Sequence, residues 1–210
     1  MGTSSGALIG ALYSAGYNPE DILEKIISTK FLDVVSITPF DFSGLFSLNP
    51  TIEYLKKYLP QNFEDLHVKF SCCVVNRNKK HLIVDSGDLV SAVCASFSIP
   101  RIFKPVKIDC ISDGPFQDGG IVDRIGLYNR IINDNISRDE ITLIHLIKKS
   151  QSVSSNNFYD DLLNRYENIK ILRSEATGER IFKSKKTIEQ YKYSKDKLKK
   201  DMLHLLLNDN

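Results

Sequence analysis

The sequence of 210 residues contains no run of 18 or more apolar residues, the length that a membrane-spanning helix needs. Its first residues show neither the basic segment nor the cleavage site of a secretory signal. The formal net charge is only +2, and no part of the chain shows the basic pattern of a nucleic-acid-binding surface. We therefore expect a cytoplasmic protein, either free or held at the surface of a membrane.

The sequence also lacks any C-x-x-C spacing among its four cysteines, which are Cys72, Cys73, Cys94 and Cys110. Adjacent Cys72 and Cys73 lie in a strand-like segment, where neighbouring side chains point to opposite faces and make a poor metal clamp. We expect reduced, mostly buried thiols and no metal site. Cys94 or Cys110 as a nucleophile is an alternative, although neither has a histidine nearby in the sequence.

Helices and strands alternate along the first 150 residues, and this order predicts an α/β layered fold. The apolar segment 141–147, ITLIHLI, is typical of a parallel strand covered on both faces. The aromatic segment 39–46 is expected to cover the core rather than to line an acyl pocket. Helices are expected at 5–16, 49–59 and 88–98, and a further helix is expected from Pro19 onward with an apolar stripe that reaches Ile27. The other expected strands are 67–75, 81–86 and short segments near 104 and 116.

A serine-rich polar segment, SQSVSSNN at 150–157, is the best candidate for a linker. It divides the chain into a domain of residues 1–150 and a helical, lysine-rich extension of residues 151–210. Eight lysines lie between Lys183 and Lys200, where the acidic residues are Glu189 and Asp196. We favour an exposed amphipathic helix on the edge of the domain, with attachment to an anionic membrane surface as the alternative.

The stretch GTSSG at residues 2–6 fits the G-x-S-x-G pattern of a nucleophile elbow. Its central residue is Ser4, and the flanking Gly2 and Gly6 permit the strained backbone that such a turn requires. The backbone N–H of Ser5 would face a developing oxyanion at the start of the following helix. A serine hydroxyl is a weak nucleophile at neutral pH, so Ser4 needs a base.

Two kinds of base are available to Ser4. Of the histidines His67, His81, His145 and His204, we consider His145 the best candidate, because it follows the order Ser, Asp, His of an α/β-hydrolase triad, although it lies inside an apolar strand. The carboxylate alternative is Asp118 in FQDGG, where Gly119 and Gly120 indicate an unusual backbone or a close approach. A plain turn aspartate is the competing interpretation of the same residues.

Three segments, taken together and in this order, resemble the patatin-like phospholipase family. They are GTSSGALIGALYSAGYNPEDI at the elbow, SGDLVSAVCASFSIPRIFKPV in the middle of the domain, and FQDGGIVDRIGL, which is similar to the family's D-G-G/A motif. The resemblance covers roughly residues 2–147. It implies a three-layer α/β/α sandwich with a mostly parallel central sheet.

The resemblance also implies a Ser–Asp dyad, with Ser4 as the nucleophile and Asp118 as the proton acceptor. The implied reaction is hydrolysis of acyl esters in phospholipids, lysophospholipids or other lipids through an acyl-enzyme, without a metal or a cofactor. Gly2, Gly6, Gly119 and Gly120 are the motif glycines in this scheme, and the partner is a lipid or a membrane surface.

The family's glycine-rich loop, of the D-G-G-G-x-R-G type, is missing from these residues, as are the strands before the elbow. That loop supplies N–H donors to the oxyanion hole in the family, so a chain without it is expected to lose catalytic rate. We expect that Met1 is not the true start and that the missing part is encoded upstream. A complementing second chain is one alternative, and a shortened, inactive relative that binds lipid or protein is another.

Overall fold

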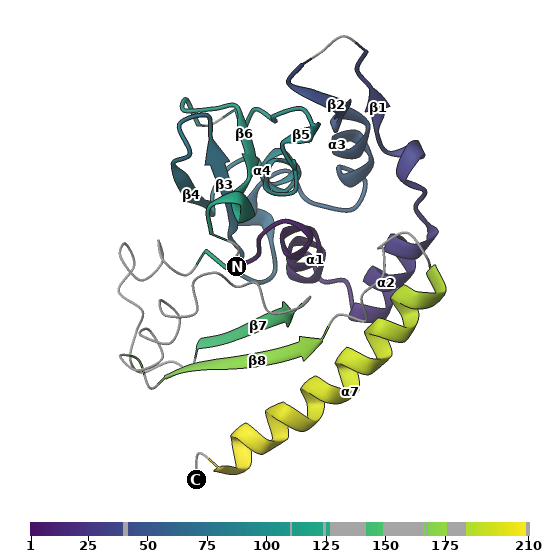
Figure 1. The fold of residues 1–210 in the computed structure, drawn as a ribbon, viewed down its shortest axis with the longest axis vertical. Coiled ribbons are helices and arrows are strands. Elements are labelled where there is room, and N and C mark those ends of the chain that lie inside the picture. Colours follow the sequence, from purple (N-terminus) through teal and green to yellow (C-terminus); the bar gives the residue numbers. More distant parts are fainter. Residues whose placement is uncertain are drawn as a thin grey trace. The chain divides into compact units, whose positions relative to one another are not determined.

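The computed structural model describes residues 1–39, 42–109, 111–123, 125–126, 142–148, 166, 168–175 and 184–208. The chain forms two compact units, residues 1–135 and 136–210. Both combine helices with small sheets (Figure 1), so the fold is mixed α/β, as the sequence predicts. No helix in the described part of the chain is long and apolar enough to span a membrane.

The helices of the first unit begin where the sequence predicts them. They are α1 (Ser5–Ser14), α2 (Pro19–Ser28), α3 (Asn49–Leu55) and α4 (Leu89–Ser96), with short 3₁₀ turns at Phe31–Asp33, Phe63–Asp65 and Gly119–Ile121. The side chain of Asn18 caps α2 by accepting the N–H of Asp21 at 2.9 Å, and Pro19 occupies the first helical position. These caps explain why local sequence was sufficient to place the helix starts.

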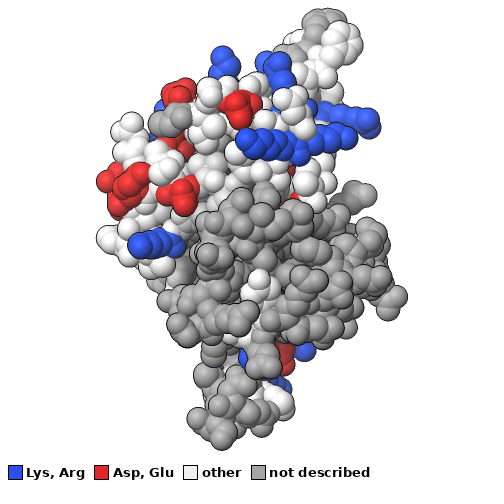
Figure 2. Space-filling model, turned by 90° about the vertical axis from the view of Figure 1, so that its left-hand side faces the viewer, with Lys and Arg blue, Asp and Glu red and all other residues white. Residues whose placement is uncertain are grey.

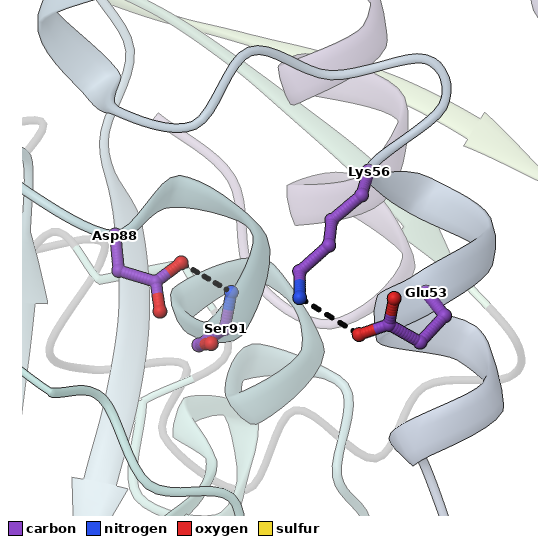
Figure 3. A network of polar contacts seen from close by, with 4 residues as sticks. All are labelled: Glu53, Lys56, Asp88 and Ser91. Atoms are coloured by element: carbon purple, nitrogen blue, oxygen red, sulfur yellow. Dashed lines mark hydrogen bonds and ion pairs between the residues drawn. The ribbon is translucent and has the colours of Figure 1, made fainter.

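Helices α3 and α4 pack against each other, and polar contacts define their ends (Figure 3). The carboxylate of Asp88 caps α4 by accepting the N–H of Ser91 at 3.1 Å. Lys56, directly after α3, donates to Glu53 at 2.7 Å. That hydrogen bond and the charge of Glu53 raise the pKa of Lys56, with a smaller effect from Asp88. The Lys56–Glu53 pair is exposed, so we assign it little stabilising energy.

Two three-stranded sheets belong to the first unit. In one, β2 (Gly44–Ser47) pairs antiparallel with β1 (Ser36–Ile37) and parallel with β5 (Arg101–Phe103). In the other, β3 (Cys72–Asn76) lies between β4 (His81–Val84) and β6 (Phe116–Asp118) and is antiparallel to both. These sheets of mixed and antiparallel pairing do not confirm the expected three-layer sandwich with a mostly parallel central sheet.

Strand β3 and helix α4 form the centre of the first unit's core. All five residues of β3 and nearly the whole of α4 are buried, and the two elements pack directly on each other. Helix α1 contacts α4 through its small residues, of which Ala7 and Ala11 are fully buried. Because these side chains are short, the N-terminus of α1 can lie close to β3, where the elbow is formed.

The aromatic segment 39–46 covers the core only in part. Phe46 packs against Phe103 with ring centroids 6.4 Å apart. Phe42, by contrast, is fully exposed, and Leu45 is largely exposed. The expectation that this segment covers the core is therefore wrong for Phe42 and Leu45. Phe42 lies in the loop between β1 and β2, and Leu45 lies in β2.

The second unit contains β7 (Thr142–Lys148), which is parallel to β8 (Ile169–Glu175), and α7 (Ser184–Asn208), which packs on β8. Strand β7 and the lysine-rich helix confirm the sequence prediction. Strand β8 lies where the sequence indicated only helix, and Leu143 is 46% exposed, so β7 is not covered on both faces at this position. The expected linker lies outside the described residues, and the division into domains at residues 150 and 151 stays a prediction.

Candidate active site

Ser4 lies in a strained turn between a strand-like residue and a helix. The N–H of Gly2 donates to the carbonyl of Ser71 at 2.9 Å, and Gly2 forms a parallel bridge with Cys72. Helix α1 begins at Ser5, so the chain changes direction within two residues. Ser4 has φ 56° and ψ −126°, a conformation that L-residues rarely adopt and that costs about 1–3 kcal/mol. A strand-to-helix turn with a strained serine is the geometry of a nucleophile elbow.

The two glycines of the elbow serve different purposes. A Cβ added to Gly2 would lie 2.6 Å from the carbonyl carbon of Gly6 and closer still to its oxygen, so only glycine fits there. A Cβ added to Gly6 would meet nothing within 4 Å. The first turn of α1 therefore closes against the backbone of Gly2, which requires a glycine at that position and not at Gly6.

Asp118 is the last residue of β6 and its side chain is buried, with 7% of the residue exposed. Its Oδ1 accepts the N–H of Gly120 at 2.8 Å, which caps the 3₁₀ turn that follows. Its own N–H donates to the carbonyl of Ser98 at 3.0 Å. The first contact holds the carboxylate of Asp118 and the second holds its backbone. The sequence alone could not show whether Asp118 was held in this way or was a simple turn residue.

Strand β3 pairs with the elbow segment and with the strand that ends at Asp118. Strand β4 occupies one edge of β3 from Cys72 to Val75, so Gly2 and β6 must share the other edge. Gly2 lies opposite Cys72 and runs parallel to β3, whereas Asp118 lies opposite Val74 at the end of an antiparallel strand. Gly2, two residues before Ser4, and Asp118 therefore lie opposite residues of β3 that are two positions apart.

The backbone of Cys73 supports both halves of the site. Its N–H donates to the carbonyl of Gly2 at 3.2 Å. A Cβ added to Gly119 would lie 2.6 Å from the carbonyl oxygen of Cys73 and 2.7 Å from its carbonyl carbon. Gly119 is thus required because the backbone of β3 approaches it closely. Of the two explanations that the FQDGG sequence allowed, an unusual backbone or a close approach, the second holds for Gly119.

Sequence reasoning missed two serines at the end of α4. Ser96 and Ser98 are both fully buried. The hydroxyl of Ser96 accepts the N–H of Ser4 at 3.1 Å and donates to the carbonyl of Cys73 at 2.7 Å. The only sequence signal for these contacts is the presence of small polar residues in an otherwise apolar helix end.

The other candidate nucleophiles and bases fit less well. Burial raises the pKa of the Cys72 and Cys94 thiols, which disfavours the reactive thiolate. Cys110 lies outside the described residues. His145 belongs to β7 in the other compact unit, and its role as a base stays a prediction. Among the described residues, no group of three His, Cys, Asp or Glu side chains could hold a metal ion.

Comparison with known proteins agrees with this geometry. The model of the patatin-like phospholipase family matches residues 1–129, more than half of the chain, and this range includes both Ser4 and Asp118. No curated protein matches the sequence. The chain therefore belongs to the patatin-like phospholipase family, and this membership indicates a lipid acyl hydrolase.

Proposed function

We propose that the protein hydrolyses fatty-acyl esters of lipids with Ser4 as the nucleophile and Asp118 as its base. The observation that supports this proposal is the register on β3, where Gly2 of the elbow lies opposite Cys72 and the buried Asp118 lies opposite Val74, together with the strained backbone of Ser4. The family membership supports the substrate class, and the close approaches at Gly2 and Gly119 support the roles of the two motifs. The complete three-layer sandwich of the family is part of the same proposal.

The proposed reaction has two steps. Asp118 accepts the hydroxyl proton of Ser4 as Ser4 attacks the ester carbonyl, and the alcohol portion of the lipid leaves with a proton. The resulting acyl-enzyme is then hydrolysed by a water that Asp118 activates, which releases the fatty acid and restores Ser4. No cofactor or metal takes part in this scheme.

The N-terminus of α1 supplies the first oxyanion donor in this proposal. The N–H groups of Gly6 and Ala7 donate to the carbonyls of Thr3 and Ser4 at 3.0 and 2.9 Å. The N–H of Ser5, at the start of the helix, is the group that faces the developing negative charge. A glycine-rich loop that donates further N–H groups, from a further segment or a complementing chain, would complete the oxyanion hole.

A membrane surface is the proposed partner, and the β1–β2 hairpin is the proposed contact. Ile37, Phe42 and Leu45 expose most of their surface there, and Leu45 is next to Ile102 across the parallel pair of β2 and β5. The hairpin projects from the first unit (Figure 1), and Figure 2 shows several Lys and Arg side chains, with some Asp and Glu, below the uppermost tip. Apolar side chains beside positive charge suit an anionic lipid surface. The cytoplasmic location expected from the sequence stays a prediction.

Turnover of a soluble p-nitrophenyl acyl ester tests the proposed chemistry. We expect Ser4→Ala to abolish turnover and Asp118→Asn to lower kcat by about 10²–10⁴-fold, because a positioned base contributes on that order. His145→Ala should keep the wild-type rate. Loss of activity in the histidine variant alone would favour a Ser-His-Asp esterase. No Ser4-dependent turnover at all would favour an inactive lipid- or protein-binding relative.

A further inference from the structure

We propose that Ser96 is a positioning residue that holds the backbone of Ser4 in its strained turn. This inference rests on the proposed function, because it concerns how the nucleophile is oriented. Ser96 is the last residue of α4 and is fully buried, so its hydroxyl is inaccessible to substrate and acts only through its two neighbours.

The hydroxyl of Ser96 joins the elbow to β3. It accepts the N–H of Ser4 at 3.1 Å and donates its own proton to the carbonyl of Cys73 at 2.7 Å. The N–H of Cys73 donates to the carbonyl of Gly2 at 3.2 Å. The elbow is therefore attached to one residue of β3 twice, directly at Gly2 and through Ser96 at Ser4.

This arrangement uses both hydrogen-bonding functions of one hydroxyl. Because the short hydrogen bond to Cys73 fixes the direction of the hydroxyl proton, a lone pair of the oxygen stays available to the N–H of Ser4. Without the hydroxyl, the N–H of Ser4 and the carbonyl of Cys73 both lose a partner. The positive φ of Ser4 would then lack the contact that opposes its relaxation.

The same end of α4 also holds the base. The carbonyl of Ser98 accepts the N–H of Asp118 at 3.0 Å, whereas the hydroxyl of Ser98 donates to the carbonyl of Lys104 at 2.8 Å. Residues 96–98 thus contact the backbone of both proposed catalytic residues, through a side chain at Ser4 and through the main chain at Asp118. The end of α4 therefore helps to set the distance between Ser4 and Asp118 in this proposal. Of its two contacts, only the one made by the Ser96 hydroxyl can be removed by a side-chain substitution.

Removing this hydroxyl with Ser96→Ala should lower kcat for a p-nitrophenyl ester by about 10–100-fold, because small displacements of a reacting group have effects of that size. KM should change by less than about threefold, since no contact with substrate is removed. The rate of covalent labelling by a fluorophosphonate should fall in parallel with kcat. The matched control is Thr51→Val, which also removes a buried hydroxyl, here one that donates to the carbonyl of Val34 in another part of the unit.

The outcomes separate the inference from the proposed function. If wild type is labelled at Ser4 and Ser96→Ala loses kcat while Thr51→Val does not, the positioning role stands. If Ser96→Ala keeps the kcat and labelling rate of Thr51→Val, the inference is overturned and the proposed function is untouched. If wild type shows no labelling at Ser4, the proposed function fails and the inference fails with it. If Ser96→Ala does not fold by circular dichroism, Ser96→Cys, with a similar shape and a much weaker hydrogen-bonding group, carries the same prediction.

Discussion

At the scale of single residues, the site depends on places where two backbones nearly touch. Gly2 closes against Gly6, and Gly119 closes against the backbone of Cys73. Ser4 adds a third constraint through its positive φ. These positions are strained or tightly packed, and such features are maintained only where the surrounding structure enforces them. In this chain the surrounding structure is β3 and the end of α4.

Gly119→Ala is the sharpest test of this packing. The new Cβ would lie 2.6 Å from the carbonyl oxygen of Cys73, which is backbone and cannot move aside cheaply. We expect a loss of about 1–3 kcal/mol in the free energy of unfolding, the usual effect of overpacking. Gly6→Ala is the matched control, because its Cβ meets nothing and alanine favours the helix. Urea denaturation measures both variants, and an equal effect in the two would contradict the account.

His81 gives the fold a dependence on pH. Burial lowers its pKa in the folded protein below the ordinary value of 6.5, although Asp123 partly opposes the shift. The unfolded chain therefore binds the proton more readily, so this contribution to stability is complete above pH 6.5 and is lost as pH falls below it. We expect the free energy of unfolding to fall more steeply between pH 7 and 5 in wild type than in His81→Gln. Identical slopes in urea titrations would show that His81 does not contribute.

The buried thiols should be unreactive in the native protein. Burial raises the pKa values of Cys72 and Cys94, so the thiolate that attacks a disulfide reagent is scarce and also inaccessible. We expect a thiol reagent such as DTNB to leave both cysteines unmodified at pH 7.5 and to modify them after denaturation. Rapid native modification of Cys94, located by peptide mass spectrometry, would restore it as a candidate nucleophile.

At the scale of elements, local signals and long-range pairings differ in what a sequence can predict. Asn18 and Asp88 are caps whose meaning is contained in the next few residues, so the starts of α2 and α4 were predictable. The bridge between Gly2 and Cys72 joins residues 70 positions apart, and no periodic pattern predicts it. Strand β8 was missed because its residues, IKILRSE, alternate too weakly to separate them from the charged helix that follows.

In the candidate site, too, local motifs could be recognised in the sequence and long-range pairings could not. Ser4 and Asp118 could be proposed from the sequence because each lies in a short glycine motif. The sequence could not indicate that Gly2 and Asp118 pair with the same edge of β3, because that depends on strand register. Ser96 could not be identified either, since a serine at the end of a helix has no motif and its partners are 92 and 23 residues away.

The proposed membrane contact of the β1–β2 hairpin can be tested separately from catalysis. We expect Phe42→Asp and Leu45→Asp each to weaken binding to phosphatidylserine-containing vesicles by about tenfold or more, since burying one such side chain contributes about 1.5–3 kcal/mol. Turnover of a soluble ester should be unchanged. Val68→Asp, at an exposed apolar residue outside the hairpin, is the matched control in a sedimentation assay. Equal binding by all three variants and wild type would remove the hairpin as the membrane contact.

At the scale of the whole molecule, the small net charge limits what electrostatics can contribute to membrane binding. The formal charge is +2, and in α7 Lys197 pairs with Asp201 at 3.4 Å while Lys195 lies over the ring of Tyr191. If the apolar hairpin dominates binding, raising NaCl from about 50 to 500 mM should weaken vesicle binding by less than about threefold. A much steeper loss would show that basic side chains dominate binding, either those near the hairpin or the lysines of α7, which are the alternative that the sequence raised.

The central claim, that Ser4 is a nucleophile activated by Asp118, is tested most directly by trapping the covalent intermediate. The protein is incubated with a fluorophosphonate, digested, and analysed by mass spectrometry for the modified peptide. The account predicts a single adduct on Ser4 that is absent in Ser4→Ala, forms far more slowly in Asp118→Asn and is unchanged in His145→Ala. An adduct on another residue, or labelling of Ser4 that does not depend on Asp118, would contradict it.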